Sequence, residues 1–326
     1  MKFRTFDHTD FATSEIGLGC WQIGGADWGD VSDREAHAIL AKAVECGVNF
    51  FDTADVYGNG RSEELIGSFL RSTRPPVFVA TKLGRNGIYP NNYTEATVRG
   101  ATEASLRRLR TEALDLTQLH CIPTEVMRRG EVFEWLRKLK REGKVRNFGA
   151  SVESMEEALL CLEQEGLSSL QIIFNLFRQK PIHALFEAAK AKSVALIIRL
   201  PLASGLLGGR LTKQARFAAS DHRNFNRDGQ LFNVGETFAG IPFETGIDLV
   251  EELRPAVPPG MTMAQWAMRW ILDDDAVTVV IPGATRAEQV ASNAATSDLP
   301  PLGEETHREL QRFYEEKVAQ SIRGPY

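Results

Sequence analysis

The chain has 326 residues and a mass of 36.2 kDa, and 43% of the residues are hydrophobic, so a single domain over residues 1–326 can bury a large core. A net charge of −5 and a pI near 5.8 argue against nucleic acid or an anionic membrane as the main partner. The uncharged stretch at residues 166–177 is too short to span a membrane, and residues 1–4 lead into no signal-peptide core. We therefore expect a cytoplasmic protein.

The cysteines are few, far apart and without CxxC spacing. A disulfide scaffold or a zinc site needs closer and more numerous cysteines. We therefore expect no metal and four free, mostly buried thiols, at Cys20, Cys46, Cys121 and Cys161.

Strand and helix patterns alternate along the chain. Residues 2–6 and 14–16 predict a small N-terminal hairpin, connected by residues 7–10. Apolar or alternating runs then predict eight strands, at residues 16–20, 47–51, 77–80, 114–119, 147–151, 171–175, 195–199 and 277–281. Helical patterns separate them, at residues 32–46, 63–71, 94–108, 126–142, 153–165, 182–191 and 263–272.

The order of these elements predicts the fold class. A strand, helix, strand unit requires parallel neighbouring strands and a right-handed crossover. Eight such strands predict an α/β fold, a (β/α)8 TIM barrel with the N-terminal hairpin across its bottom. The stretch of residues 202–260 after the seventh strand is longer than an ordinary connection, which predicts a functional segment.

Four polar residues follow the ends of the early strands: Asp52, Tyr57, Lys82 and His120. Parallel strands place their carboxyl ends on one side of the sheet, so these side chains are expected to face a common site. Each has a simpler interpretation, as a turn aspartate, a packing aromatic, a solvated lysine and a structural histidine. A carboxylate, a phenol, an ammonium and an imidazole at one place nevertheless indicate a site for proton transfer.

The sequence around these residues resembles the aldo-keto reductases, NAD(P)H-dependent enzymes on a (β/α)8 barrel. The run D-T-A-D-V-Y-G at residues 52–58, followed by Arg-Ser-Glu at residues 61–63, is similar to the family signature. Further similar motifs follow in order, at residues 80–82, 119–120, 143–146, 149–151 and 281–283, with Gln289 and Asn293.

The resemblance implies a role for each of the four residues. Carbonyl reduction moves a hydride from the nicotinamide to carbon and a proton to oxygen. We expect Tyr57 to be the general acid and Lys82 to lower its pKa by about 1–3 units. Asp52 would keep Lys82 charged and oriented, and His120 would donate a hydrogen bond to the carbonyl oxygen.

The cofactor cannot be held by a Rossmann motif, because Gly17-Leu18-Gly19 is followed by Gln22 where the third glycine would stand. The resemblance instead implies that Ser151 and Gln171 bind the carboxamide and that Arg199, Leu200 and Leu202 lie under the nicotinamide. It also implies further cofactor contacts from Trp21 and Asp52, from Arg210 at the pyrophosphate, and from Gly283, Thr285, Arg286, Gln289 and Asn293 at the adenosine half.

The chain departs from the family pattern at three of these positions. Val152 stands where many relatives have a polar residue, and Arg199 stands where an aromatic is common. The Arg199 guanidinium would repel an oxidised nicotinamide unless it forms an ion pair, for example with Asp228. Gly283 replaces a lysine frequent in some subfamilies. Arg286 and Arg210 then remain as the 2′-phosphate candidates, and we expect NADP(H) rather than NAD(H).

The substrate is the part that the sequence leaves open. Aldehydes, ketones and sugars, in either direction of the reaction, fit the expected site. Five aromatics could line its mouth or merely pack: Trp21, Trp28, Phe225, Phe232 and Phe238.

Three other functions are considered. One is an NAD(P)-dependent sugar dehydrogenase. Another is a non-enzymatic nucleotide-sensing subunit, since potassium-channel beta subunits resemble the family but depart from it at the histidine position, which here is His120. The third is a Schiff-base aldolase with Lys82 as nucleophile. The resemblance favours the reductase with a small carbonyl or alcohol substrate.

Overall fold

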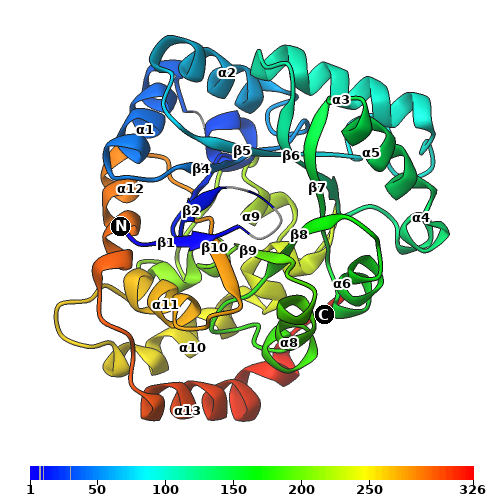
Figure 1. The fold of residues 1–326 in the computed structure, drawn as a ribbon. Helices are drawn as coiled ribbons and strands as arrows, with labels where there is room; N and C mark the ends of the chain where they lie inside the picture. The colour runs from blue at the N-terminus through cyan, green and yellow to red at the C-terminus, as the bar shows by residue number, and fades with distance from the viewer. Residues whose placement is uncertain (7–8, 10, 30) are drawn as a thin grey trace.

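The computed structural model describes residues 1–6, 9, 11–29 and 31–326. Eight parallel strands lie side by side in chain order and curl into a barrel, which confirms the predicted (β/α)8 fold (Figure 1). The strands are β3 (Leu18–Gly19), β4 (Phe50–Asp52), β5 (Phe78–Leu83), β6 (Leu114–His120), β7 (Val145–Ser151), β8 (Leu167–Ile173), β9 (Ala195–Arg199) and β10 (Val277–Val280).

The barrel closes where β3 meets the end of β10. The Gly17 amide donates to the carbonyl of Val280 at 2.8 Å, and the Gly19 amide donates to the carbonyl of Pro282 at 3.0 Å. A Cβ on Gly19 would stand 2.8 Å from the Ile281 carbonyl oxygen. The Gly-Leu-Gly run is therefore needed for close approach at the barrel seam, which is a structural role rather than phosphate binding.

Helices surround the barrel in the order in which they follow the strands (Figure 1). They are α1 (Asp33–Glu45), α2 (Arg61–Thr73), α3 (Glu95–Leu109), α4 (Thr124–Arg129), α5 (Glu131–Arg141), α6 (Met155–Leu162), α7 (Pro181–Ala184), α8 (Phe186–Ala191), α9 (His222–Phe225), α10 (Phe243–Leu253), α11 (Met263–Leu272), α12 (Ala287–Ala294) and α13 (Glu304–Phe313).

Two predicted helices are broken in the structure. The helix expected at 126–142 is divided into α4 and α5 by Gly130, whose φ of 79° lies in the left-handed region and ends the helical hydrogen bonding. The helix expected at 182–191 is divided into α7 and α8 at Leu185, where φ and ψ are −134° and −41°. Both breaks leave the order of strands unchanged.

The N-terminal hairpin is present, as predicted, and consists of β1 (Phe3–Thr5) and β2 (Ala12–Ser14). Most of its connection, residues 7, 8 and 10, lies outside the described residues. Phe6 is fully buried and packs inside the barrel against Phe50 and Phe78, with ring centroids 6.0 and 5.4 Å away. The hairpin therefore closes this end of the barrel with apolar surface.

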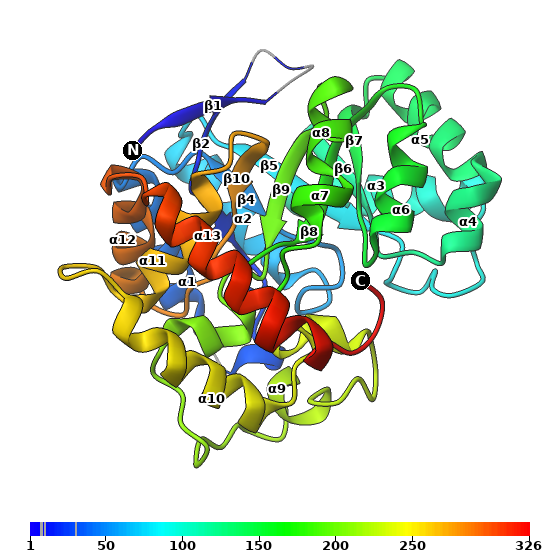
Figure 2. The same ribbon diagram turned by 90° about the horizontal axis from the view of Figure 1, so that it is seen from below.

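The long segment after β9 lies at the opposite end of the barrel, where the strands have their carboxyl ends (Figure 2). It contains α9, α10 and short 3-10 helices at Ala203–Gly208, Val234–Glu236 and Phe238–Gly240, which the sequence patterns did not predict. None of the helices in the described part of the chain has the length and apolar character needed to cross a membrane.

Candidate active site

A cavity of about 870 Å³ opens at the carboxyl ends of the strands. Asp52, Tyr57 and His120 line it at one end, and the beginning of α12 lines it at the other. The cavity therefore joins three of the four predicted catalytic residues to the region predicted to hold the cofactor.

Lys82 is the centre of a buried polar cluster behind the cavity. Its Nζ donates to Asp52 Oδ1 at 2.6 Å, to the Thr53 carbonyl at 2.8 Å and to the Tyr57 hydroxyl at 3.2 Å. Lys82 is 1% exposed and Asp52 is 3% exposed. The structure thus brings the predicted carboxylate, ammonium and phenol into one hydrogen-bonded set.

The strands explain how these residues meet. Asp52 and His120 are the last residues of β4 and β6, as expected, whereas Lys82 lies within β5, which runs on to Leu83. Tyr57 belongs to the turn after β4, where its ring stacks on Trp21 with centroids 5.7 Å apart and an interplanar angle of 16°. Rigid strands therefore position the ion pair, and an aromatic neighbour positions the phenol.

The pKa of Tyr57 differs from the prediction. Burial raises the pKa of the phenol to about 12, although the Lys82 charge acts to lower it. The prediction considered only the cation and missed the larger effect of burial. Burial also opposes the charge on Lys82, but Asp52 and Tyr57 outweigh it and raise the lysine pKa. The ammonium therefore stays charged.

His120 is neutral in this environment. Burial lowers its pKa well below the usual value, and the cations Lys82, Arg85 and Arg199 lower it further. Its ring meets Tyr57 edge to face at 5.8 Å, and its Nδ1 is buried without a hydrogen-bond partner among the described residues. A neutral imidazole can donate from one nitrogen only, which suits a hydrogen bond to a carbonyl oxygen.

Two residues predicted to bind the carboxamide have other contacts here. Gln171 Nε2 donates to Asp52 Oδ2 at 2.7 Å, so the side-chain amide of the glutamine is hydrogen-bonded to the carboxylate that pairs with Lys82. Ser151 Oγ lies 3.6 Å from Cys121 Sγ. Both side chains still line the cavity.

Arg199 forms an ion pair, but not with the predicted Asp228. Its Nη1 donates to Glu236 Oε1 and its Nη2 donates to the Val152 carbonyl at 2.9 Å. Asp228 instead pairs with Arg323 at 2.8 Å. Burial opposes the charge on Arg199, but Glu236 and the other neighbouring groups, Glu153 among them, together outweigh it and raise the pKa. The carboxylate neutralises the guanidinium that was expected to repel an oxidised nicotinamide.

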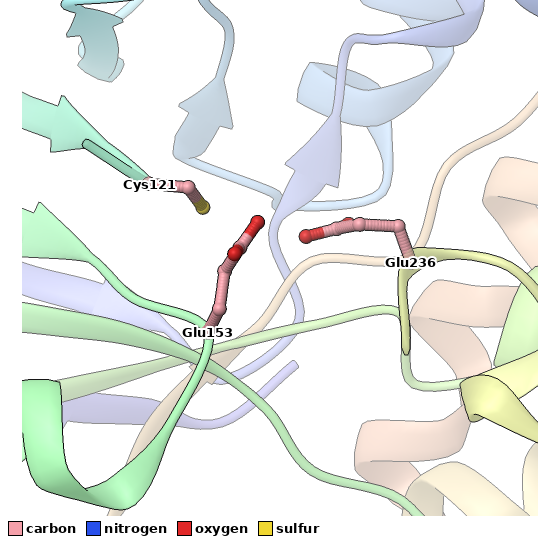
Figure 3. Close-up of side chains that lie close together, drawn as sticks. All are labelled: Cys121, Glu153 and Glu236. Carbon is pink, nitrogen blue, oxygen red and sulfur yellow. The ribbon is translucent and has the colours of Figure 1, made fainter. Parts of the chain in front are cut away.

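Cys121, Glu153 and Glu236 point toward one another beside this pair, and their donor atoms lie within 4.8 Å of each other (Figure 3). Glu153 also pairs with Arg85 at 3.1 Å. Burial and the neighbouring Glu236 raise the pKa of Glu153 to about 7. Each carboxylate is thus paired with a guanidinium group. Arg85, Arg199 and Glu236 line the cavity as a mixed-charge wall, and Glu153 supports it through Arg85 without lining the cavity.

Arg85, Glu153 and Glu236 are site residues that were not predicted from the sequence. Arg85 follows β5 and Glu153 follows β7 by two residues, so a rule that selects polar residues after strand ends would have found both. Glu236 lies in an irregular segment 37 residues after Arg199 and carried no such signal.

The far end of the cavity holds most of the residues predicted to bind the adenosine half. Arg210 and Arg286 line it, are exposed and form no ion pair within the described residues. Gln289 Oε1 accepts from the Thr285 amide at 2.8 Å and from the Arg286 amide at 3.2 Å, so it caps α12. Gly283, Thr285 and Asn293 also line the cavity. Leu200 and Leu202, which were predicted to lie under the nicotinamide, line it as well. Arg254 is an additional cation that was not predicted.

The five candidate aromatics divide into two groups. Trp21, Trp28 and Phe232 line the cavity. Phe238 is fully buried and packs on Phe243 at 4.8 Å, and Phe225 packs on Phe232 at 6.1 Å. The first three therefore shape the mouth, and the last two are packing residues.

All four cysteines are free thiols, and Cys20, Cys121 and Cys161 are buried. Cys20 and Cys121 line the cavity, as their sequence neighbours suggested. Burial raises the pKa of the Cys121 thiol to about 11, so it is not a reactive thiolate.

Sequence comparison relates the chain to one family. The sequence profile of the Aldo/keto reductase family matches residues 15–315. The NADH-specific methylglyoxal reductase of Escherichia coli (strain K12) is 28% identical over 320 residues, which cover 92% of this chain and 94% of that protein.

Structural comparison agrees. The glycerol dehydrogenase AKR11B4 from Gluconobacter oxydans has a TM-score of 0.81 at 28% identity, covering 99% of this chain and 98% of the other. An aldo/keto reductase from Klebsiella pneumoniae, solved in complex with NADP and acetate, has a TM-score of 0.68 at 27% identity, covering 93% and 92%. With the strand order and the profile match, these likenesses establish that the chain belongs to the aldo/keto reductase family and is an oxidoreductase that works with a nicotinamide cofactor.

Proposed function

We propose that the protein is an NADP(H)-dependent reductase of small aldehydes, ketones or sugars, with Tyr57 as the proton donor. The observation that carries this proposal is the position of the Tyr57 hydroxyl, 3.2 Å from a lysine that is itself 2.6 Å from Asp52, at the edge of the cavity. His120 stands beside the phenol with its ring edge to face.

The cofactor, when bound, supplies a hydride to the carbonyl carbon. Tyr57 donates its proton to the carbonyl oxygen as the negative charge develops there, and Lys82 stabilises the phenolate that remains. His120 donates a hydrogen bond to the same oxygen. The ion pair with Asp52 holds Lys82 in place through the step, and solvent returns a proton to Tyr57 afterwards.

The cavity suits a dinucleotide because it connects the catalytic end to the start of α12. Ser151 would contact the carboxamide, Leu200 and Leu202 would face the nicotinamide, and Gln289 and Asn293 would contact the adenosine. The proposed preference for NADP(H) rests on Arg210 and Arg286, two exposed guanidinium groups at that end. The related methylglyoxal reductase is NADH-specific, so the preference is a property of this chain to be measured.

A second candidate is oxidation of a polyol or sugar in the reverse direction. Its support is the mixed wall, since Arg85 and Glu236 offer both donors and acceptors to hydroxyl groups, next to the rings of Trp21 and Trp28. The structurally similar glycerol dehydrogenase is consistent with such a substrate.

Catalysis through a lysine Schiff base is disfavoured by the surroundings of Lys82. A nucleophilic lysine must lose its proton, whereas this ammonium makes three hydrogen bonds and its pKa is raised. The residue is also 1% exposed, which leaves no room for a carbonyl carbon to approach.

The test is a screen of NADPH and NADH oxidation across sugars, aliphatic and aromatic aldehydes and ketones, beside the reverse reaction with polyols. We expect saturable reduction of at least one class with NADPH preferred. Borohydride trapping with each active carbonyl is the parallel control and should leave no adduct on Lys82. Cofactor binding without turnover of any substrate class would contradict the proposal.

A further inference from the structure

Arg178, which follows β8, is a buried cation. The residue is 1% exposed, and none of the carboxylates in the described residues forms an ion pair with it. Its Nη2 donates to the Pro325 carbonyl at 2.8 Å, and its guanidinium lies 4.3 Å from the centroid of the Tyr326 ring. Burial lowers its pKa to about 10. A buried charge held by a carbonyl and an aromatic face depends on both groups staying in place.

The segment of residues 323–326 is itself anchored on two sides. Toward β8, the Lys180 amide donates to the Tyr326 hydroxyl at 2.8 Å, and the Lys180 Nζ donates to the Tyr326 carbonyl at 2.6 Å. Toward the long segment after β9, Arg323 Nε donates to the Gly240 carbonyl at 2.9 Å and Arg323 Nη1 pairs with Asp228 at 2.8 Å. The 323–326 segment thus connects two parts of the barrel rim.

The 323–326 segment contacts residues 228 and 240 of the long segment after β9, and two residues between them line the cavity. Glu236 pairs with Arg199, and Phe232 lines the mouth. Between them, Gly235 lies so close to the Arg178 guanidinium that no Cβ would fit. Arg178 therefore supports the backbone immediately before Glu236.

We propose that Arg178 and Tyr326 are positioning residues for substrate recognition, because they hold the turn at residues 233–236 in the place where Glu236 reaches Arg199. Neither residue lines the catalytic cavity, so both act through the turn. The inference rests on the proposed function, since it assigns the mixed-charge wall to the substrate side. Loss of either residue releases Glu236 and leaves the Asp52–Lys82–Tyr57 cluster intact.

The first test compares Arg178→Met and Tyr326→Ala with the matched control Tyr326→Phe, which keeps the ring over the guanidinium. We expect the first two to raise KM for the carbonyl substrate about tenfold and to change kcat less than about threefold. The NADPH Kd, from fluorescence titration, should stay within about twofold. Tyr326→Phe loses the hydrogen bond from the Lys180 amide but keeps the ring and the contact of Lys180 Nζ with the Tyr326 carbonyl, so its KM should rise less than about threefold. Unchanged KM in folded Arg178→Met and Tyr326→Ala would overturn the proposal, as would an equal loss of NADPH affinity.

The second test asks whether the effect passes through Glu236. If it does, Arg178→Met should add little to the KM increase of Glu236→Ala, whereas two independent effects would multiply. A double variant whose KM increase equals the product of the two single increases would contradict the proposed route. Should Arg178→Met fail to fold, as judged by circular dichroism, the same cycle can be run with Tyr326→Ala.

Hydrogen exchange of residues 228–240 in the cofactor-free protein gives a readout that needs no substrate. Exchange should be faster in Arg178→Met and Tyr326→Ala than in Tyr326→Phe, because the turn loses its support. Equal exchange in all three would overturn the positioning role. Faster exchange in a protein that reduces no carbonyl would support the positioning role and overturn the proposed function, so the two failures can be told apart.

Discussion

The catalytic end of the cavity and the wall formed by the segment after β9 are built in different ways. The catalytic end stands on β4, β5 and β6, where Asp52 and Lys82 are buried and hydrogen-bonded to each other. The opposite wall stands on the segment after β9, which is irregular and includes non-glycine residues in the left-handed region, such as Leu200 with φ of 51° and Ser204 with φ of 55°. Adjacent parallel strands fix the positions of the reacting groups with respect to each other. The irregular segment can change in sequence without disturbing them, and so can change which substrate is bound.

The largest effect is expected from the phenol of the strand-built end. Tyr57→Phe removes the transferable proton but keeps the ring on Trp21, so turnover should fall about 10² or more while cofactor affinity stays nearly unchanged. Steady-state kinetics measure the turnover, and a fluorescence titration with NADPH measures the cofactor affinity. Near-normal turnover would remove Tyr57 from the mechanism and leave His120 to be tested as the acid.

Lys82→Met should have the next largest effect, because it leaves the buried Asp52 carboxylate without its counter-charge. Removing one partner of a buried ion pair costs about 3–5 kcal/mol of unfolding free energy. Activity should fall as well. Lys82 lowers the pKa of Tyr57, so its loss raises that pKa and disfavours the phenolate that alcohol oxidation requires.

The pH dependence of alcohol oxidation is therefore expected to shift upward by about one unit in Lys82→Met. Urea unfolding checks the loss of stability, and oxidation rates across pH check the shift. Lys82→Arg, which keeps the charge, is the control. An unchanged pH profile in a folded Lys82→Met variant would show that the lysine does not control the acidity of Tyr57.

At the far end of the cavity, a smaller and more selective effect is expected. Arg286→Ala should weaken NADPH binding by about 1.5–3 kcal/mol, the scale of a charged hydrogen bond, and barely change NADH binding. Fluorescence quenching titrations measure the Kd of NADPH and of NADH in this variant and in the companion variant Arg210→Ala. Equal losses for the two cofactors would mean that Arg286 does not recognise the 2′-phosphate.

The smallest effect concerns the stability of the strand-built end. Asp55 is 2% exposed, and its Oδ1 has no partner among the described residues. Burial, with a contribution from Glu63, raises the pKa of Asp55 to about 7. The folded state then binds this proton more tightly than the unfolded state, so stability decreases as pH rises from about 4 to 7.

Asp55→Asn stays neutral and should stabilise the protein by about 1–3 kcal/mol at pH 8, and by less at pH 5. Urea unfolding at the two pH values measures the difference, with Glu63 left unchanged. An equal loss of stability at both pH values would indicate that the carboxylate makes a contact that the asparagine cannot replace.

Much of the fold followed from local patterns. The strand ending at His120 and the helix with Ser32 as its N-cap are recognisable because apolar spacing and capping chemistry act over a few residues. The break at Gly130 was missed because the apolar period continues through it. A single left-handed glycine ends the helix without changing that period.

The sequence by itself determined that Asp52, Lys82 and His120 would meet, because each stands at or near the end of a strand and parallel strands end on one side. Only the tertiary structure decided the acidity of Tyr57, since burial raises its pKa and burial depends on the whole fold. The partner of Arg199 was decided in the same way. Glu236 reaches Arg199 from a turn that packs against Arg178, and Arg178 is in turn held by Pro325, 147 residues further along the chain. No local sequence pattern can encode contacts over such distances.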